Sequence, residues 1–109
     1  LLKDLPIVRP YQDAENYSAL HLYPIQINLN LINKSRKEVF DELRRGGVGV
    51  NVHYIPIHMQ PYYHDLGFRE KDFPVAEEYY AKTLSIPLFH TMSIKQQNKV
   101  VNGLTRVLE

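Results

Sequence analysis

The sequence contains no cysteine among its 109 residues. Disulfide bonds and thiolate metal sites are therefore excluded, and the composition fits a reducing compartment, which leads us to expect a cytoplasmic protein. Net charge is also slight, because 13 Lys and Arg oppose 12 Asp and Glu. This near-neutral charge gives no reason to expect nucleic acid or a membrane as a partner. No apolar run approaches the roughly 18–20 residues that span a bilayer, and no signal peptide is visible.

The residues that are present are typical of one globular domain, with 44% hydrophobic and 23% charged residues. Tyrosine, with 8 residues, is the one unusual count. Its ring is apolar and its tip polar, which suits pockets and subunit contacts. The chain begins at Leu1 and not at Met, so we expect it to be a piece of a longer protein.

Alternation of apolar and polar residues predicts two strands with one buried face each. In residues 21–29 the expected buried face carries His21, Tyr23, Ile25, Ile27 and Leu29. In "GVGVNVHY", residues 47–54, one face carries Val48, Val50, Val52 and Tyr54. A short apolar run, "LSIPLF", predicts a third extended segment. Residues 1–20 read as the end of a helix followed by an extended connection, because Pro6 and Pro10 interrupt any regular pattern.

Three helices are predicted from their terminal signals. Ser35 followed by Glu38, and Ser93 followed by Gln96, have the spacing of capping boxes. The first of these helices should end at Gly46 or Gly47, and a third helix should carry Pro74 in its first turn. The order of elements predicts an α/β (α+β) fold, a short sheet packed with about three helices.

Three of the five histidines, His53, His58 and His64, lie in one short stretch. A zinc site needs three or four ligands converging at about 2.0–2.1 Å, often with two of them on one helix. Two prolines separate these histidines, so no regular element aligns them, and we expect no metal site. We interpret His64 and His90 as partly exposed loop or strand residues.

His53 differs because it shares its strand face with Gly49 and Asn51. Such a face packs a core poorly and can approach a ligand, to which an imidazole can donate a hydrogen bond or from which it can take a proton. A hydrogen-bonded structural histidine is the equal alternative. The neighbouring "RRGGVGV" is a poor phosphate loop, because such loops precede a helix and this one follows a helix.

Two longer stretches, "GVGVNVHYIPIHMQPYY" and "FPVAEEYYAKTLSIPLFHTMSIKQQNKVVNGL", resemble the C-terminal region of the DegT-type sugar aminotransferases. The likeness extends from about His21 to the end of the chain. These are pyridoxal-phosphate enzymes of the aspartate-aminotransferase fold (type I) that aminate nucleotide-linked keto-sugars. The motif "VNVHYIPIH" is most similar to that of the subgroup that makes UDP-4-amino-4,6-dideoxy-N-acetyl-altrosamine. Relatives of this subgroup include spore-coat polysaccharide proteins.

The resemblance implies that residues 1–20 connect to a missing large domain and that residues 21–109 form the C-terminal small domain. It also implies that the lysine that binds the cofactor covalently, and most phosphate ligands, lie in the large domain, so this chain carries no catalytic residue and would be inactive alone. The residues expected near pyridoxal phosphate or sugar are His53, Asn51, Tyr54 and His58. The implied partners are a nucleotide-sugar substrate, glutamate as amino donor, and a second subunit in a homodimer.

An alternative function that is not enzymatic stays open. A small α/β unit rich in tyrosine can be a non-catalytic interaction or dimerisation domain.

Overall fold

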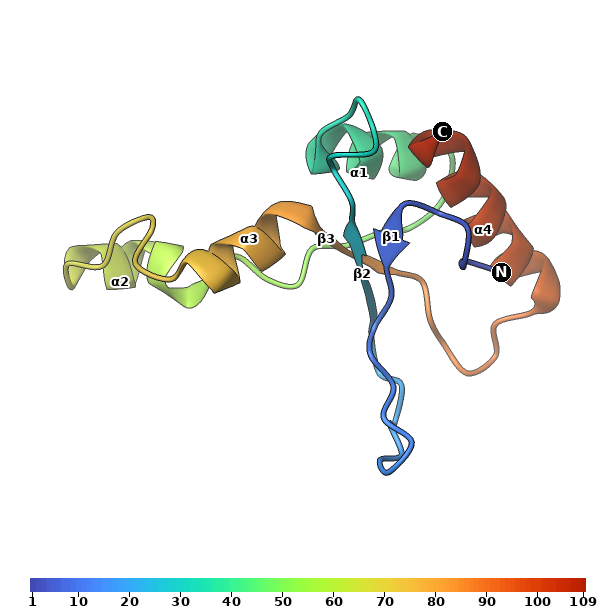
Figure 1. Ribbon diagram of the computed structural model, residues 1–109, viewed down its shortest axis with the longest axis horizontal. Coiled ribbons are helices and arrows are strands. Elements are labelled where there is room, and N and C mark those ends of the chain that lie inside the picture. Colours follow the sequence, from blue (N-terminus) through green and yellow to red (C-terminus); the bar gives the residue numbers. More distant parts are fainter.

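The computed structural model describes all 109 residues and shows a short antiparallel sheet at its centre. The sheet has three strands in the order β1 (Ile7–Val8), β2 (Tyr23–Ile27) and β3 (Thr83–Ile86). Ile25 lies opposite Leu84, and Ile7 lies opposite Ile27. Helices α1 (Arg36–Arg45) and α4 (Ile94–Leu108) lie side by side at one end of the molecule (Figure 1). The predicted α/β class is therefore confirmed.

The two long helices begin where their capping residues predict. At Ser35 the hydroxyl accepts from the Glu38 backbone N–H while the Glu38 carboxylate accepts from the Ser35 backbone N–H. Ser93 and Gln96 repeat this arrangement at the start of α4. Each box satisfies backbone donors that have no partner within the helix. Helix α1 ends at Gly46, and Gly47 adopts the left-handed conformation, with φ of 73°.

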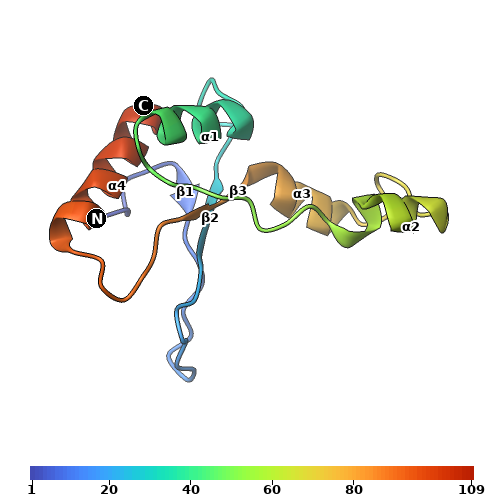
Figure 2. The same ribbon diagram turned by 180° about the vertical axis from the view of Figure 1, so that it is seen from behind.

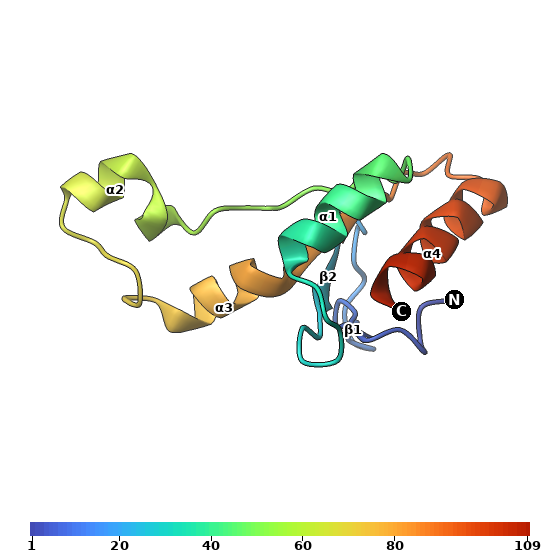
Figure 3. The same cartoon turned by 90° about the horizontal axis from the view of Figure 1, so that it is seen from above.

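Residues 55–82 form an arm that extends away from α1 and α4 (Figures 1 and 3). The arm contains a 3₁₀ turn η1 (Ile57–Met59), a single-turn helix α2 (Pro61–Asp65) and helix α3 (Pro74–Lys82), which returns to β3. At the base of the arm, the Arg36 guanidinium lies 5.0 Å from the centroid of the Tyr80 ring. No helix of the structure has the length and apolar character needed to cross a bilayer.

The hydrophobic core lies between the sheet and the two long helices. Its twelve buried side chains are Ile25, Ile27, Val39, Leu43, Val48, Val50, Leu84, Ile86, Val100, Leu104, Val107 and Leu108. The structure buries Ile25 and Ile27 on the face predicted for β2, whereas His21, expected on the same face, is exposed. No residue of α2 or α3 belongs to this core, so the arm is held by contacts outside it.

Gly103 lets α4 approach the chain that follows α1. A Cβ at this position would lie 2.9 Å from Cγ2 of Val48, and Val48 is a short, buried side chain that cannot swing away. Glycine thus lowers the helix propensity of α4 but permits its close packing against Val48.

The strand predicted over residues 47–54 is wrong. This segment is extended, but it makes only one pair of sheet bonds, between the backbones of Asn51 and Ser85. The antiparallel register places Gly49 opposite Pro87, which has no N–H to donate, so the ladder cannot continue in that direction. The predicted faces hold for the buried Val48 and Val50. Tyr54, expected on the same face, is 74% exposed instead.

The end of a helix predicted near the start of the chain is also wrong. Residues 3–6 turn, and Ile7–Val8 then pairs with β2 as an edge strand. Pro6 and Pro10 flank this strand and limit it. Part of the expected connecting segment therefore belongs to the sheet. Residues 9–22 form a long loop between β1 and β2 (Figure 1).

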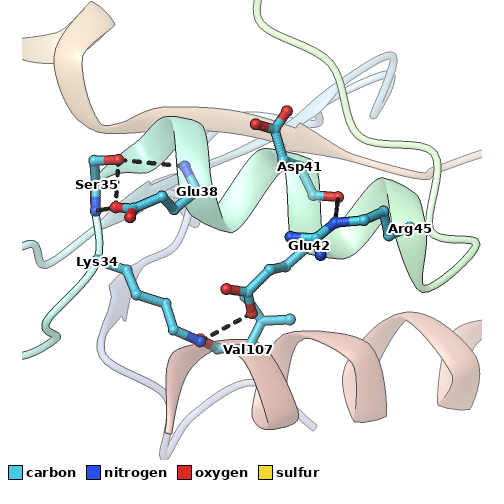
Figure 4. Close-up of polar contacts among 7 residues, drawn as sticks. All are labelled: Lys34, Ser35, Glu38, Asp41, Glu42, Arg45 and Val107. Atoms are coloured by element: carbon cyan, nitrogen blue, oxygen red, sulfur yellow. Dashed lines mark hydrogen bonds and ion pairs between the residues drawn. The ribbon is translucent and has the colours of Figure 1, made fainter.

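Lys34 joins the start of α1 to the end of α4 (Figure 4). Its ammonium group donates to the Glu42 carboxylate and to the Val107 carbonyl, each at 2.9 Å. The carbonyl is at the C-terminal end of α4, where the helix dipole favours a cation.

We expect Lys34→Met to lower the free energy of unfolding by about 1 kcal/mol, because about a third of each partner's side chain remains in water and screens the pair. Denaturation by urea measures the loss. The matched control is Lys37→Met: Lys37 pairs only with Asp41 on the same exposed helix face, so the midpoint should barely change. Equal effects of the two substitutions would contradict the link between the helices.

Candidate functional site

His53 is held against the edge of the sheet by the single bridge that follows α1. The Asn51 N–H donates to the Ser85 carbonyl at 3.0 Å, and the Ser85 N–H donates to the Asn51 carbonyl at 2.8 Å. Seen from behind, this extended segment runs from α1 across β3 and into the arm (Figure 2). The bridge therefore fixes the backbone two residues before His53.

The His53 ring is partly buried, and its Nδ1 lies 2.9 Å from the hydroxyl oxygen of Ser85. The other ring nitrogen, Nε2, has no partner. Only one side-chain nitrogen or oxygen in the structure is both buried and without a hydrogen bond, and it is Nε of Arg36. The unpaired Nε2 of His53 is therefore not buried. One nitrogen of His53 is thus anchored in the domain, and the other is open to a ligand.

Tyr54 packs edge-on against His53, with ring centroids 4.7 Å apart. The peptide bond between the two residues is cis. The Tyr54 side chain also lines an open, mainly apolar hollow together with the α3 N-cap, Phe73, and with Val75 and Tyr79 of α3. His53 and Tyr54 therefore lie where the domain meets the base of the arm.

Sequence reasoning missed Ser85. Its only signal was one polar residue inside the apolar run "LSIPLF". Ser85 is 5% exposed, and its partner lies 32 residues away in the chain. Nothing local to the sequence could have paired the two residues.

His58 lies in a different environment from His53. It is 6% exposed, its Nε2 lies 2.8 Å from the Glu77 carboxylate, and its ring is 4.8 Å from that of Phe73. These contacts join η1 to α3 inside the arm. A packed, paired histidine of this kind accounts for its burial without a ligand, so its predicted nearness to substrate stays a prediction.

The three clustered histidines of the sequence do not converge. His53 binds Ser85, His58 binds Glu77, and His64 is exposed on α2. No three histidine or carboxylate side chains lie close enough together to hold a metal ion. His21 and His90 are exposed.

Glu77 is the carboxylate that secures the arm. The hydrogen bond from His58 lowers its pKa below the ordinary value of 4.5, and the bond from the Lys71 backbone N–H adds to this effect. A carboxylate with a depressed pKa stabilises the folded state above its unfolded-state pKa, and that stability is lost as pH falls through the folded-state value.

We therefore expect the arm to loosen as pH falls below 4.5 and through the lower folded-state pKa of Glu77. Protection factors, which correct for the intrinsic pH dependence of amide hydrogen exchange, should fall at acid pH for residues 57–65 of the unchanged chain. In Glu77→Gln they should be low at neutral pH and depend less on pH. Glu78→Gln is the matched control, because Glu78 pairs with Lys82 within α3. Protection factors that do not change with pH in the unchanged chain would contradict this role.

The residues around His53 supply an amide, an imidazole, a phenol and a hydroxyl, none of which can bind pyridoxal phosphate covalently. Covalent attachment needs a lysine amine, and no lysine amine is hydrogen-bonded or ion-paired to Asn51, His53, Tyr54 or Ser85. The lysine amines that have partners bind elsewhere: Lys34 to Glu42 and Val107, Lys37 to Asp41, and Lys82 to Glu78.

The fold and the sequence both define an aminotransferase-type domain. The model of the DegT/DnrJ/EryC1/StrS aminotransferase family matches residues 1–105. The chain belongs to this family. The match includes the first twenty residues, which lie before the stretch where the resemblance was clearest.

Two curated relatives and one solved structure illustrate the likeness. The spore coat polysaccharide biosynthesis protein SpsC of Bacillus subtilis is 32% identical over 94% of this chain and 27% of its own length. The UDP-4-amino-4,6-dideoxy-N-acetyl-beta-L-altrosamine transaminase of Campylobacter jejuni is 34% identical over 84% of this chain and 24% of its own length. Helicobacter pylori PseC, an aminotransferase involved in the biosynthesis of pseudoaminic acid, has the same fold, with a TM-score of 0.86 and 22% identity over 98% of this chain and 29% of PseC. The chain thus spans about a quarter of the length of the curated relatives.

Proposed function

We propose that this chain is the C-terminal small domain of a pyridoxal-phosphate-dependent aminotransferase that aminates a nucleotide-linked keto-sugar. The pathway we propose is the biosynthesis of a surface polysaccharide or a nonulosonic acid. Glutamate is the proposed amino donor, and the proposed assembly is a cytoplasmic homodimer. The proposal divides the chain into a connecting segment, residues 1–20, and the small domain, residues 21–109.

The observation that carries the proposal is the family match over residues 1–105. Relatives named as a polysaccharide biosynthesis protein and as an altrosamine transaminase support a nucleotide-linked sugar as the substrate. The chain spans about a quarter of those relatives, which supports placing the lysine and the phosphate ligands in another part of the polypeptide.

In this proposal the chain contributes positioning and closure. His53 presents its open Nε2 to the substrate or cofactor, while Ser85 holds Nδ1 at 2.9 Å. Asn51, on the same exposed side of the segment, and Tyr54, at the apolar hollow, complete this edge of the site. Pyridoxal phosphate supplies the electron sink of transamination when it is bound. Precise orientation of the sugar lowers the barrier because the reacting groups then need no further ordering.

The test is expression of the polypeptide that carries this chain together with its upstream sequence. We expect pyridoxal-type absorption that shifts when glutamate is added, and formation of an amino-sugar from a UDP-linked 4-keto-sugar. The 109-residue chain by itself should show neither. A longer polypeptide that binds no pyridoxal phosphate would refute the proposal.

A second candidate is a non-catalytic interaction or dimerisation domain, and the exposed apolar surface of the arm favours it. Ile57 is 67% exposed, Tyr62 68% and Val75 81%. Large exposed apolar side chains, here one on each of η1, α2 and α3, are typical of surfaces that bind a partner. A self-associating chain with no pyridoxal-phosphate-binding sequence upstream would favour this candidate.

A further inference from the structure

The side chain of Ser85 makes a single hydrogen bond, and its partner is His53. Its hydroxyl lies on β3, where the residue is 5% exposed, and its only partner is Nδ1 of the His53 ring at 2.9 Å. The backbone of Ser85 separately binds Asn51. The same residue therefore holds the segment through its main chain and the imidazole through its side chain.

The direction of this hydrogen bond decides what His53 can offer. If Nδ1 carried the proton, it would donate to the hydroxyl oxygen, and the buried hydroxyl proton of Ser85 would then have no acceptor. A buried donor without a partner destabilises the folded state. If the hydroxyl donates to Nδ1, the buried hydroxyl and Nδ1 satisfy each other, and the proton of the neutral ring lies on the unburied Nε2.

We propose that Ser85 is a positioning residue that holds neutral His53 as its Nε2–H tautomer, so that the open ring nitrogen is a hydrogen-bond donor and not a base. The ligand group it fits is an acceptor oxygen, such as a phosphate, carbonyl or sugar oxygen. The nearness of that ligand rests on the function proposed above, whereas the tautomer depends only on this chain.

The test is ¹⁵N NMR of the histidine rings, recorded on the 109-residue chain at a pH where the imidazoles are neutral. Nitrogen shifts and two-bond couplings distinguish the two tautomers, and His53→Gln identifies the His53 signals. We expect His53 to be the Nε2–H form alone, whereas the exposed His64 and His90 show the tautomer mixture of a free imidazole. In Ser85→Ala, His53 should change to that mixture.

Two further variants separate positioning from structural effects. Thr83→Val removes another buried hydroxyl of β3, whose partner is the Ile25 carbonyl, and should leave the His53 signals unchanged. Ser85→Cys keeps the size of the side chain with a weaker donor and should give an intermediate tautomer ratio.

An Nδ1–H form of His53 in the unchanged chain would overturn the proposal. So would a tautomer ratio in Ser85→Ala equal to that of the unchanged chain. Neither result depends on pyridoxal phosphate or on a sugar, so failure of this inference is distinguishable from failure of the proposed function.

Discussion

His53→Ala is expected to lower kcat about 10- to 100-fold in the full-length aminotransferase proposed above, because a misplaced substrate reacts that much more slowly. Far-UV circular dichroism and pyridoxal-type absorption should remain unchanged, since the His53 ring is not part of the hydrophobic core. Steady-state kinetics over a range of keto-sugar concentrations measures the effect.

Two variants sharpen this experiment. His53→Gln retains an N–H donor on a neutral side chain and should recover part of the lost rate if His53 acts as a donor. His64→Ala alters an exposed histidine of α2 and should leave the kinetics unchanged. Kinetics of His53→Ala that match those of the unchanged enzyme at every sugar concentration would show that His53 is a structural residue.

Leu104→Ala is expected to lower the free energy of unfolding by about 3 kcal/mol, within the range of buried leucine truncations. Leu104 is fully buried in the core between α4, α1 and the sheet. Its neighbour Gly103 already brings α4 close to Val48, so the helix cannot easily move inward to fill the cavity. Because small domains have a total stability of about 5–15 kcal/mol, the loss should be visible as a large shift in the urea midpoint.

Ile94→Ala is the matched control for this substitution. Ile94 lies on the same helix but is 70% exposed, so its truncation removes little buried area and should change stability by about 0.5 kcal/mol or less. A loss for Leu104→Ala as small as that for Ile94→Ala would mean that the core is not packed as described.

Much of the fold could be predicted because its signals are local. Ser35 with Glu38, and Ser93 with Gln96, lie three residues apart and satisfy helix N-termini without help from the rest of the chain. The alternation through Ile25 and Ile27 identified the buried face of β2.

The predictions for residues 47–54 failed because strand pairing, and not the local pattern, decided the structure of this segment. Alternation alone could not reveal that the segment through Asn51 pairs at one residue only, because the limit on one side comes from Pro87, far away in sequence. Tyr54 followed the alternation in the sequence, yet it is 74% exposed because the chain leaves the core there and enters the arm.

The sequence by itself determined the family, the helix starts at Ser35 and Ser93, and the burial of Ile25 and Ile27 in β2. Only the tertiary structure decided which partners the histidines have: Ser85 for His53 and Glu77 for His58, which lie 32 and 19 residues away in the chain. The physical reason is that capping and periodicity depend on neighbours in sequence, whereas the partner of a side chain depends on which elements the core brings together.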